Sequence, residues 1–194
     1  MLYFLLKRKR IILYLPGYMN ETIYLFNSLL GELSIHANET VVTAVLFSKQ
    51  PNDQSVPKKK DSNHPLIKLC CTQLSEYFEG SRKEFDLPVQ QSGTAFQQKV
   101  WKELTKIGYG KTISYLELSK LYGNIKTIRA VGSANGKNPV AIIIPCHRVI
   151  GNDGKMVGYG GKIWRKQWLL EHEGAIVNKQ QSLFPMHVAK ATEL

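Results

Sequence analysis

Residues 112–136 read TISYLELSKLYGNIKTIRAVGSANG, and this stretch carries the clearest fold signal in the chain. Ser114, followed three residues later by Glu117, forms a capping-box pattern that predicts the start of a short helix, and Gly123 predicts its end. A second helix is predicted from about residue 125 to residue 135, where an Asn-Gly pair stops it. Two short helices joined by a glycine-containing turn are typical of a helix-turn-helix.

The second of these helices carries small residues, namely Ala130, Gly132, Ser133 and Ala134. Small side chains allow a helix backbone to come close to whatever lies against it. Two interpretations stay open on this feature alone: close approach to a binding partner, or close packing against another helix of the same chain.

An earlier helix is predicted by a second capping box, formed by Thr94 and Gln97. Gly108 and Gly110 predict its end. Apolar residues recur at helical spacing between these limits: Phe96, Val100, Leu104 and Ile107.

The first half of the chain indicates strands followed by a helix. Residues 32–47 alternate between apolar and polar around an Asn-Glu turn, which predicts a β-hairpin. Residues 48–63 are polar, lysine-rich and contain two prolines, so we expect an exposed connection. Pro65 favours the first turn of a helix and Gly80 its end. The expected apolar face of that helix comprises Leu66, Leu69, Cys70, Leu74, Tyr77 and Phe78.

These elements predict an α+β fold, with a small N-terminal α/β domain built on a β-hairpin or small antiparallel sheet. A mainly helical C-terminal domain containing the helix-turn-helix follows it. We expect an N-terminal arm of unknown role over residues 1–27, the small domain over 28–90, the helical domain over 91–175 and a tail over 176–194.

The first twenty residues are apolar and aromatic, but Lys7–Arg10 interrupt them. Neither half therefore reaches the roughly 20 apolar residues of a membrane span. No small-residue cleavage site follows a basic leader in the order of a signal peptide. Weak membrane association of the arm stays an alternative.

The formal net charge of +11 is unevenly distributed. Residues 21–90 carry seven basic and nine acidic side chains, whereas residues 91–174 carry thirteen basic and five acidic ones. Such a domain attracts polyanions, because each neutralised phosphate releases counterions. The alternative is a basic protein whose charge only aids solubility.

The chain has three cysteines, of which Cys70 and Cys71 are adjacent. This number cannot form a secreted disulfide framework, and no Cys-x-x-Cys pair is present to hold zinc. We therefore expect a reducing, intracellular setting.

Residues 138–150 read NPVAIIIPCHRVI and place the third cysteine, Cys146, after an apolar run. The β-branched residues 140–144 predict a buried strand, and Pro145 favours an extended residue before it. Val149 and Ile150 are expected to be a strand, followed by a Gly-Asn-Asp-Gly turn. A last helix is predicted over residues 163–173, with Trp164, Trp168 and either Leu169 or Leu170 facing inward and Gly174 as its stop.

Cys146 is a candidate nucleophile. The thiolate is the reactive form of cysteine, and a histidine together with a basic neighbourhood can lower the thiol pKa enough to supply it. The alternative is a small buried apolar residue, which is the favoured interpretation for Cys70 and Cys71.

Five motifs follow one another along the chain. They are Arg129-Ala130-Val131-Gly132, Asn138-Pro139, Pro145-Cys146-His147-Arg148-Val149, Gly158-Tyr159-Gly160-Gly161 and His172-Glu173-Gly174. In order and spacing this set resembles the O6-alkylguanine-DNA alkyltransferases, the methylated-DNA-protein-cysteine S-methyltransferases. The resemblance covers about residues 28–175 and is densest from Thr94 onward.

The resemblance implies DNA repair by irreversible transfer of a methyl or other alkyl group from guanine O6 to Cys146, with O4-alkylthymine as a further candidate substrate. It implies a relay from Cys146 to His147, which is held by Glu173. Neighbouring side chains in an extended segment point apart, so the first step of that relay needs a bend or a bridging water. A carboxylate at a helix C-terminus lies at the unfavourable end of the helix dipole, which a partner such as His147 would offset. An exposed Glu173 without a partner is the alternative.

The resemblance also implies a pocket for the base. Tyr115 matches a tyrosine that stabilises the negative charge left on the purine. Asn138 matches an asparagine that braces the active-site turn, although an ordinary Asn-Pro turn would look the same. The expected pocket residues are Tyr115, Val149, Val157, Tyr159 and Gly160. Some members carry serine where this chain has Gly160, so only the backbone amide can serve there.

Arg129 matches the arginine that takes the place of a flipped nucleotide, and an atom inside a duplex cannot be reached without flipping. With it, Thr127, Ala130, Gly132 and Ser133 are expected to contact the minor groove of double-stranded DNA. An alkyl-cysteine is a thioether without a carbonyl for water to attack, so each molecule would react once. No cofactor is implied, and the cysteines of the zinc site in some relatives are missing here. We expect a cytoplasmic monomer without an obligatory protein partner.

Two other classes of function compete with this one. A cysteine hydrolase could use Cys146, His147 and Glu173. It leaves the basic helix-turn-helix unexplained, and turnover of an amide or ester would be its signature. A non-catalytic lesion-binding protein of the same fold is the second alternative, but those relatives replace the cysteine.

Overall fold

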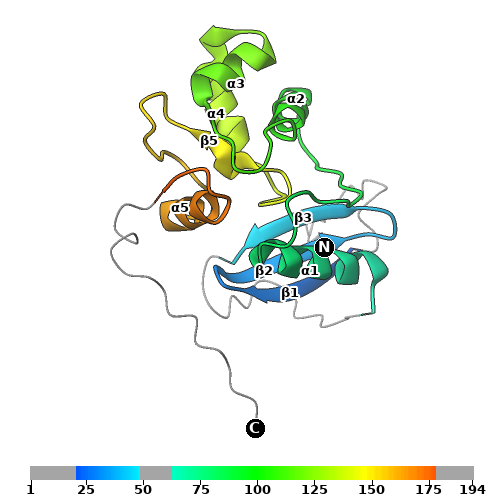
Figure 1. Cartoon of the computed structure of the whole chain (residues 1–194). Helices are drawn as coiled ribbons and strands as arrows, with labels where there is room; N and C mark the ends of the chain where they lie inside the picture. The colour runs from blue at the N-terminus through cyan, green and yellow to red at the C-terminus, as the bar shows by residue number, and fades with distance from the viewer. Residues whose placement is uncertain (1–20, 49–62, 178–194) are drawn as a thin grey trace, which may run out of the picture.

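The computed structural model describes residues 21–48 and 63–177. Its N-terminal part is a three-stranded antiparallel sheet in the order β1 (Thr22–Ser28), β2 (Gly31–Ala37) and β3 (Val42–Phe47). Helix α1 (Pro65–Phe78) covers one face of this sheet (Figure 1). The predicted hairpin is confirmed as β2 and β3, and the predicted α+β fold class is confirmed with it.

Strand β1 is a difference from the sequence analysis, which placed residues 1–27 in a separate arm. Thr22 to Ser28 pair with β2 along its whole length, so this part of the expected arm belongs to the sheet. The turn that joins the strands has Leu29-Leu30 at its centre, between Ser28 and Gly31, and Gly31 has φ +100°. The Ser28 hydroxyl also holds the turn by donating to the carbonyl of Gly31 at 2.6 Å. Residues 1–20 lie outside the described residues.

Helix α1 begins at Pro65 as predicted, and Gly80 follows it with φ +81°. The predicted apolar face is confirmed at Cys70, Leu74 and Tyr77, which are buried, whereas Ile67 packs into the core without having been predicted. Leu69 is 42% exposed, contrary to the sequence expectation.

The outer edge of β3 connects the sheet to the rest of the molecule. The amide of Val42 donates to Pro88 in the segment after α1, at 2.8 Å. Farther along the strand, the Val45 amide donates to Pro139 and the Val45 carbonyl accepts from Ala141, both at 2.9 Å. The sheet edge therefore fixes the start of the turn that leads to Cys146.

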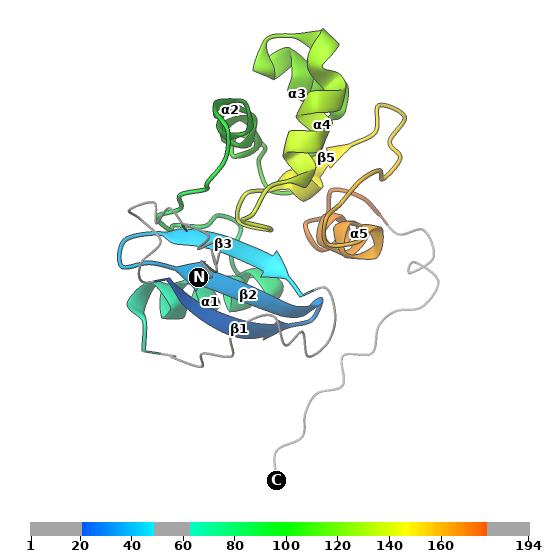
Figure 2. The same ribbon diagram turned by 180° about the vertical axis from the view of Figure 1, so that it is seen from behind.

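The C-terminal part is mainly helical, with α2 (Ala95–Leu104), β4 (Ile113–Ser114), α3 (Tyr115–Tyr122), the 3-10 helix η1 (Ile125–Thr127) and α4 (Ile128–Gly136). Figure 2 shows α2, α3 and α4 gathered on the side away from the outer strand β1. Both capping boxes are confirmed, since the Thr94 and Ser114 hydroxyls accept from the amides of Gln97 and Glu117 at 3.3 and 3.1 Å. Gly123 ends α3 with φ +106°.

Two of the small residues of α4 pack against other parts of the chain, which is one of the two interpretations that the sequence left open. Gly132 faces inward, where an added Cβ would lie 3.6 Å from the ring of Tyr115. Ala134 is buried and its carbonyl accepts from the indole of Trp101 at 2.8 Å. Ala130 and Ser133 are exposed on the other side of the helix.

The strand predicted over residues 140–144 is wrong. Only Val140 bridges to β3, and the chain then curls into a turn in which the Ile144 amide donates to Val140 at 3.0 Å. Ile142 has φ +71° in this turn, a conformation that a β-branched residue rarely adopts. The turn brings the Val140 amide and the Val140 and Ile144 carbonyls to the Asn138 side chain, three hydrogen bonds that stabilise it over an extended strand.

After this turn come the 3-10 helix η2 (Cys146–Arg148), strand β5 (Val149–Ile150) and helix α5 (Ile163–His172). Strand β5 was predicted and pairs in parallel with β4. Leu169 and Leu170 face inward as expected and Trp168 is partly buried against the core, but Trp164 is 51% exposed. Lys166, which was not expected to face inward, is fully buried. Gly174 ends the helix with φ +68°.

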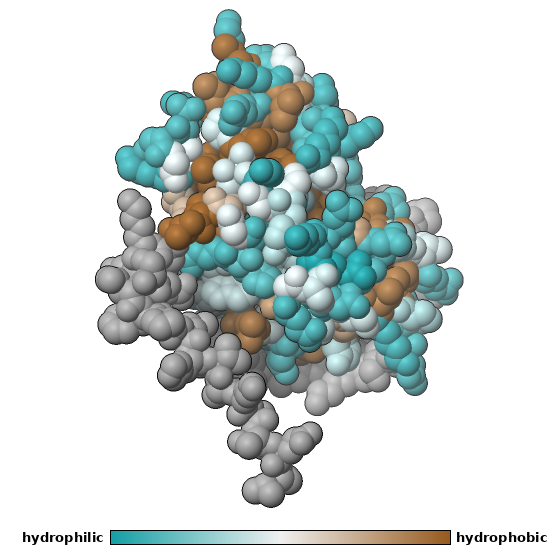
Figure 3. Space-filling model, viewed as in Figure 1, coloured by the Kyte–Doolittle hydropathy of each residue, from teal (hydrophilic) through white to brown (hydrophobic). Residues whose placement is uncertain are grey.

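On the face shown in Figure 3, hydrophilic residues cover most of the described surface and apolar ones appear in small groups. Among residues 21–48 and 63–177, no helix has both the length and the apolar character needed to cross a bilayer.

Candidate active site

The Glu173 carboxylate is the most heavily hydrogen-bonded group of the site. Its side chain is fully buried and accepts from His147 Nε2 at 2.9 Å and from Arg148 Nε at 2.8 Å. It also accepts from the Tyr77 hydroxyl at 2.8 Å and from the Gly110 amide at 3.2 Å. Burial alone would raise the pKa of Glu173, but the hydrogen bonds and charges of His147 and Arg148 outweigh it and lower the pKa to about 2.

An ionised Glu173 fixes the tautomer of His147. A carboxylate only accepts hydrogen bonds, so Nε2 carries the proton and Nδ1 keeps its lone pair. Burial lowers the pKa of His147 although Glu173 acts to raise it, so the ring is neutral at neutral pH. No group among the described residues hydrogen-bonds to the buried Nδ1. The unprotonated Nδ1 of His147 is therefore available to act as a base.

Cys146 lies at the first position of η2, next to His147, and is 5% exposed. It reaches a cavity of about 320 Å³ between β3, the end of α4 and the loop before α5. The residues that line this cavity are Leu46, Phe47, Asn135, Gly136, Lys137, Asn138, Pro139, Ala141, Cys146, Gly158, Tyr159, Gly160 and Gly161.

The pKa of Cys146 is raised, whereas the sequence analysis expected it to be lowered. Burial is the largest cause, because a thiolate loses its hydration inside the protein. The Asn138 side chain, the Lys166 charge and the amides of Cys146 and His147 act in the opposite direction without outweighing it. The resting cysteine is therefore a thiol, and a base has to take its proton.

Asn138 joins both ends of the turn that precedes Cys146. Its Nδ2 donates to the carbonyls of Ile144 at 2.8 Å and Val140 at 3.2 Å. Its Oδ1 accepts from the Val140 amide at 3.1 Å and from Gln91 Nε2 at 2.7 Å. A residue from the segment between the two domains thus contributes to holding the turn.

Tyr115 opens α3 and points toward the loop before α5. Its hydroxyl donates to the carbonyl of Val157 at 3.1 Å, with the Gly158 carbonyl at 3.4 Å. Burial raises the pKa of Tyr115, so the phenol keeps its proton as a donor.

Comparison of the sequence with family models and with known relatives identifies the family. Residues 95–175 match the model described as the DNA binding domain of 6-O-methylguanine DNA methyltransferase, and residues 20–91 match the model of its ribonuclease-like domain. The chain is 41% identical over 151 residues to the methylated-DNA–protein-cysteine methyltransferase of Methanosarcina acetivorans, an alignment covering 78% of this chain and 97% of the relative. This chain belongs to the methylated-DNA–protein-cysteine methyltransferase family.

Other members of the family agree in sequence and fold. The constitutive methylated-DNA–protein-cysteine methyltransferase of Bacillus subtilis is 41% identical over 148 residues, which cover 74% of this chain and 90% of the relative. The crystal structure of O6-methylguanine methyltransferase from Mycobacterium tuberculosis superposes with a TM-score of 0.73 at 40% identity, covering 86% of this chain and all of that one. A second structure from Mycobacterium tuberculosis, in complex with DNA, has a TM-score of 0.71 at 40% identity, with 84% of this chain and 99% of that one covered.

The expected pocket residues of this family member fall into two groups. Tyr159 and Gly160 line the cavity with Cys146. Tyr115, Val149 and Val157 do not line it. Val149 is fully buried in β5, Val157 is 45% exposed on the loop beside the cavity, and the Tyr115 hydroxyl donates to the Val157 carbonyl.

Lys166 is a site residue that the sequence analysis missed. Its ammonium group is buried and donates to the carbonyls of Val149 at 2.6 Å and Val157 at 3.0 Å. Burial lowers its pKa to about 8, and a thiolate at Cys146 acts in the opposite direction. Lys166 thus holds the strand after η2 to the loop that borders the cavity, and it places a positive charge near the sulfur.

The expected DNA-binding residues of this family member lie at or near α4. Arg129, Ala130 and Ser133 are exposed. Thr127 lies in η1, where its hydroxyl donates to the Asn124 carbonyl at 2.6 Å, and Gly132 packs toward Tyr115. The structure therefore presents three of the five expected residues openly on one short helix.

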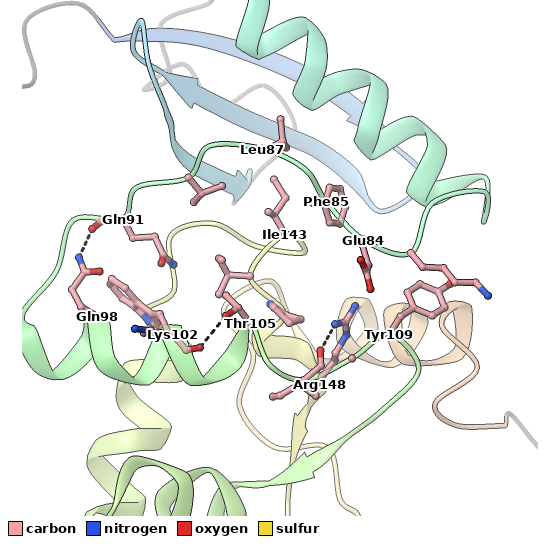
Figure 4. A pocket seen from close by; sticks show the side chains of 17 residues that line it. Glu84, Phe85, Leu87, Gln91, Gln98, Lys102, Thr105, Tyr109, Ile143 and Arg148 are labelled. Carbon is pink, nitrogen blue, oxygen red and sulfur yellow. Dashed lines mark hydrogen bonds between the residues drawn. The ribbon is translucent and has the colours of Figure 1, made fainter.

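A second cavity of about 570 Å³ lies behind the active-site turn (Figure 4). It is bordered by residues 83–91, by α2, and by Ile143, Pro145 and Arg148. In Figure 4 the side chains of Leu87, Phe85 and Ile143 lie near one another on the sheet side of this space, and Arg148 lies opposite. Cys146 is not among its lining residues, so this cavity is separate from the one that the sulfur reaches.

Proposed function

We propose that this protein repairs DNA by moving a methyl or other alkyl group from O6-alkylguanine onto Sγ of Cys146, once per molecule. The observation that carries the proposal is the buried thiol in a cavity beside the His147–Glu173 pair. The names of the relatives, methylated-DNA–protein-cysteine methyltransferase, describe the same reaction for those proteins. O4-alkylthymine is a second candidate substrate, because its alkyl group is also bonded to an exocyclic oxygen.

The proton of Cys146 has a route out of the site. Because η2 bends the chain, Cys146 and His147 are not held apart as in a strand, and a water molecule between Sγ and the free Nδ1 would complete the transfer. His147 then becomes an imidazolium, which Glu173 stabilises at 2.9 Å. The pair thus supplies a thiolate only when the reaction needs it.

Each bond that breaks in this reaction is matched by one that forms, so the transfer needs no cofactor. The sulfur–carbon bond forms as the carbon–O6 bond breaks, and the released electron pair stays on the purine. The purine then gains the proton that the thiol lost, so the products are S-alkylcysteine and guanine. Tyr115 and the backbone amides near Gly160 are the donors we assign to the developing charge on the base.

We further propose that α4 enters the minor groove of double-stranded DNA. The exposed Ala130 and Ser133 allow a close approach, and Arg129 would fill the space of the flipped nucleotide. The excess of basic residues in this half of the chain supports phosphate contacts. We expect a monomer that needs no protein partner and acts in the cytoplasm, where a cysteine acceptor stays reduced.

Stoichiometry tests the function directly. Incubation with an excess of duplex DNA containing one O6-methylguanine should add one methyl group, 14 Da, to each protein molecule and then stop. Intact-mass and peptide mass spectrometry should place that methyl on Cys146. Loss of the lesion with unmodified Cys146, or turnover beyond one equivalent, would contradict single-use transfer.

Arg129→Ala tests the flipping step. The variant loses the side chain that compensates for unstacking, which costs a few kcal/mol, so repair of duplex DNA should slow by about 10- to 100-fold. Reaction with the free base O6-benzylguanine needs no flipping and should keep its rate. Lys126→Ala, which removes a neighbouring exposed charge, is the matched control for a general loss of DNA affinity. Equal slowing with free base and duplex would exclude the assigned role.

A further inference from the structure

One wall of the acceptor cavity comes from the N-terminal sheet. Leu46 and Phe47, the last residues of β3, line the same cavity as Cys146. The ring of Phe47 lies edge-on to the ring of Tyr159, with centroids 6.4 Å apart and an interplanar angle of 65°. All the pocket residues expected from the sequence lie in the C-terminal half.

Arg165 of α5 holds this wall in place. Its guanidinium group lies over the Phe47 ring, 4.6 Å from the centroid. The same group donates from Nε to the Leu30 carbonyl at 2.7 Å and from Nη1 to the Gly161 carbonyl at 3.0 Å. One side chain therefore connects the β1–β2 turn, the end of β3 and the loop that borders the cavity.

The contact between the wall and the loop is tight. A Cβ built on Gly161 would lie 2.7 Å from Phe47 Cδ2 and 2.7 Å from Tyr159 Cε1, closer than atoms can approach. The backbone at Gly161 therefore packs directly against the aromatic ring, and a glycine is required there. Small displacements of Phe47 would move either this loop or Tyr159.

Strand β3 also holds the turn that precedes Cys146. Its edge bonds to Pro139 and Ala141, and both of these residues line the cavity. The N-terminal domain is thus positioned to determine both the width of the cavity and the location of the turn before Cys146.

From these contacts we propose that Phe47 determines which alkyl groups fit beside Cys146, and that Arg165 is the positioning residue that sets the location of the Phe47 ring. This proposal rests on Cys146 as the acceptor. It gives the N-terminal domain a part in substrate selection in addition to its support of the fold. The ring restricts the cavity, so reducing it should favour bulky adducts over methyl.

The test compares two duplex substrates that differ only in the lesion, O6-methylguanine or O6-benzylguanine. Single-turnover rates measured over a range of protein concentrations give a limiting rate and a half-saturating concentration for each. Phe47→Ala should raise the ratio of benzyl to methyl transfer by about tenfold, the order of discrimination that a change of pocket size provides. Phe47→Leu, which preserves the apolar core, should raise it less and guards against a folding defect in the alanine variant.

Arg165→Met should shift the ratio in the same direction and raise the half-saturating concentration, with a smaller change in the limiting rate. Arg165→Lys keeps the charge and should restore part of the parent ratio. Arg82→Lys, at an ion pair with Glu76 that borders no part of the acceptor cavity, is the control and should leave the ratio unchanged.

Peptide mass spectrometry distinguishes failure of the proposal about the cavity wall from failure of the proposed function. If Cys146 is alkylated but both Phe47 variants and Arg165→Met keep the parent ratio, the proposal about the wall is wrong and the acceptor assignment stands. If the parent protein itself transfers no alkyl group to Cys146, the proposed function has failed first.

Discussion

Cys146→Ser should abolish alkyl transfer, with the rate falling by at least about 10³-fold, as when the nucleophile of other covalent mechanisms is removed. A serine hydroxyl is far less acidic than a thiol, and the neutral His147 is too weak a base to ionise it. Gel or mass-spectrometric detection of the remaining O6-methylguanine in duplex DNA measures the loss. The fold should survive, because the substitution is nearly isosteric.

The matched controls for this variant are Cys70→Ser and Cys71→Ser. Burial raises the pKa of Cys70 to about 12 and that of Cys71 to about 11, so neither thiol supplies a thiolate at neutral pH. Both variants should accept one methyl group like the parent. Repair by Cys146→Ser at the parental rate would mean that another group carries the reaction.

The same variant distinguishes the competing classes of function. A cysteine hydrolase would release a product repeatedly before the substitution and none after it. A lesion-binding protein would retain the same affinity for the damaged duplex in both forms and modify neither. Only an alkyl acceptor would form one equivalent of product and carry the alkyl group on Cys146. Its serine variant would show neither.

The elements that were predicted correctly depend on local signals. Two capping boxes, at Thr94 and Ser114, and the glycines that end α3 and α5 fix helix limits through hydrogen bonds within a few residues. The hairpin of β2 and β3 follows from alternation over sixteen residues. Such signals need no knowledge of the rest of the fold.

The errors arise where individual polar side chains override the apolar pattern. Residues 140–144 have strand-forming side chains, but the four hydrogen bonds of Asn138 stabilise a turn. On α5 Lys166 is fully buried and its ammonium group donates to two carbonyls, whereas Trp164 is half exposed. A lysine in the core is not expected from hydrophobic periodicity.

The candidate site was predictable only in part, because some of its residues come from distant parts of the chain. The motif residues His147 and Glu173 could be paired through the family resemblance, and the structure places them 2.9 Å apart. Tyr77 contacts that carboxylate from a helix 96 residues earlier, and Phe47 reaches the cavity from β3. Neither residue belongs to a motif. The direction of the Cys146 pKa was wrong because burial, its largest cause, cannot be read from neighbouring residues.

Glu173→Gln should lower the free energy of unfolding by about 3–5 kcal/mol, the cost of removing one partner from a buried ion pair. Glutamine keeps the shape of the side chain but leaves Arg148, only 7% exposed, without its counter-charge. Its amide group would also face the donors of Tyr77 and His147, which one carboxylate now satisfies. Urea unfolding at pH 7 measures the loss, and alkyl transfer should slow with it because the His147 imidazolium is no longer stabilised.

The pH dependence of stability gives this variant a second, independent signature. The folded pKa of Glu173, about 2, lies below the ordinary glutamate value of 4.5, so its contribution to stability is complete above pH 4.5 and is lost as the pH falls toward 2. The lowered pKa of His147 adds a second loss of stability, which begins as the pH falls below 6.5. At that pH the histidine takes up a proton more readily in the unfolded chain than in the folded one. Glu173→Gln should remove the first of these slopes. Glu171→Gln, whose carboxylate accepts from Gln167 on the surface of the same helix, should retain both. An unchanged slope between pH 4.5 and 2 in Glu173→Gln would show that the carboxylate does not hold the site together.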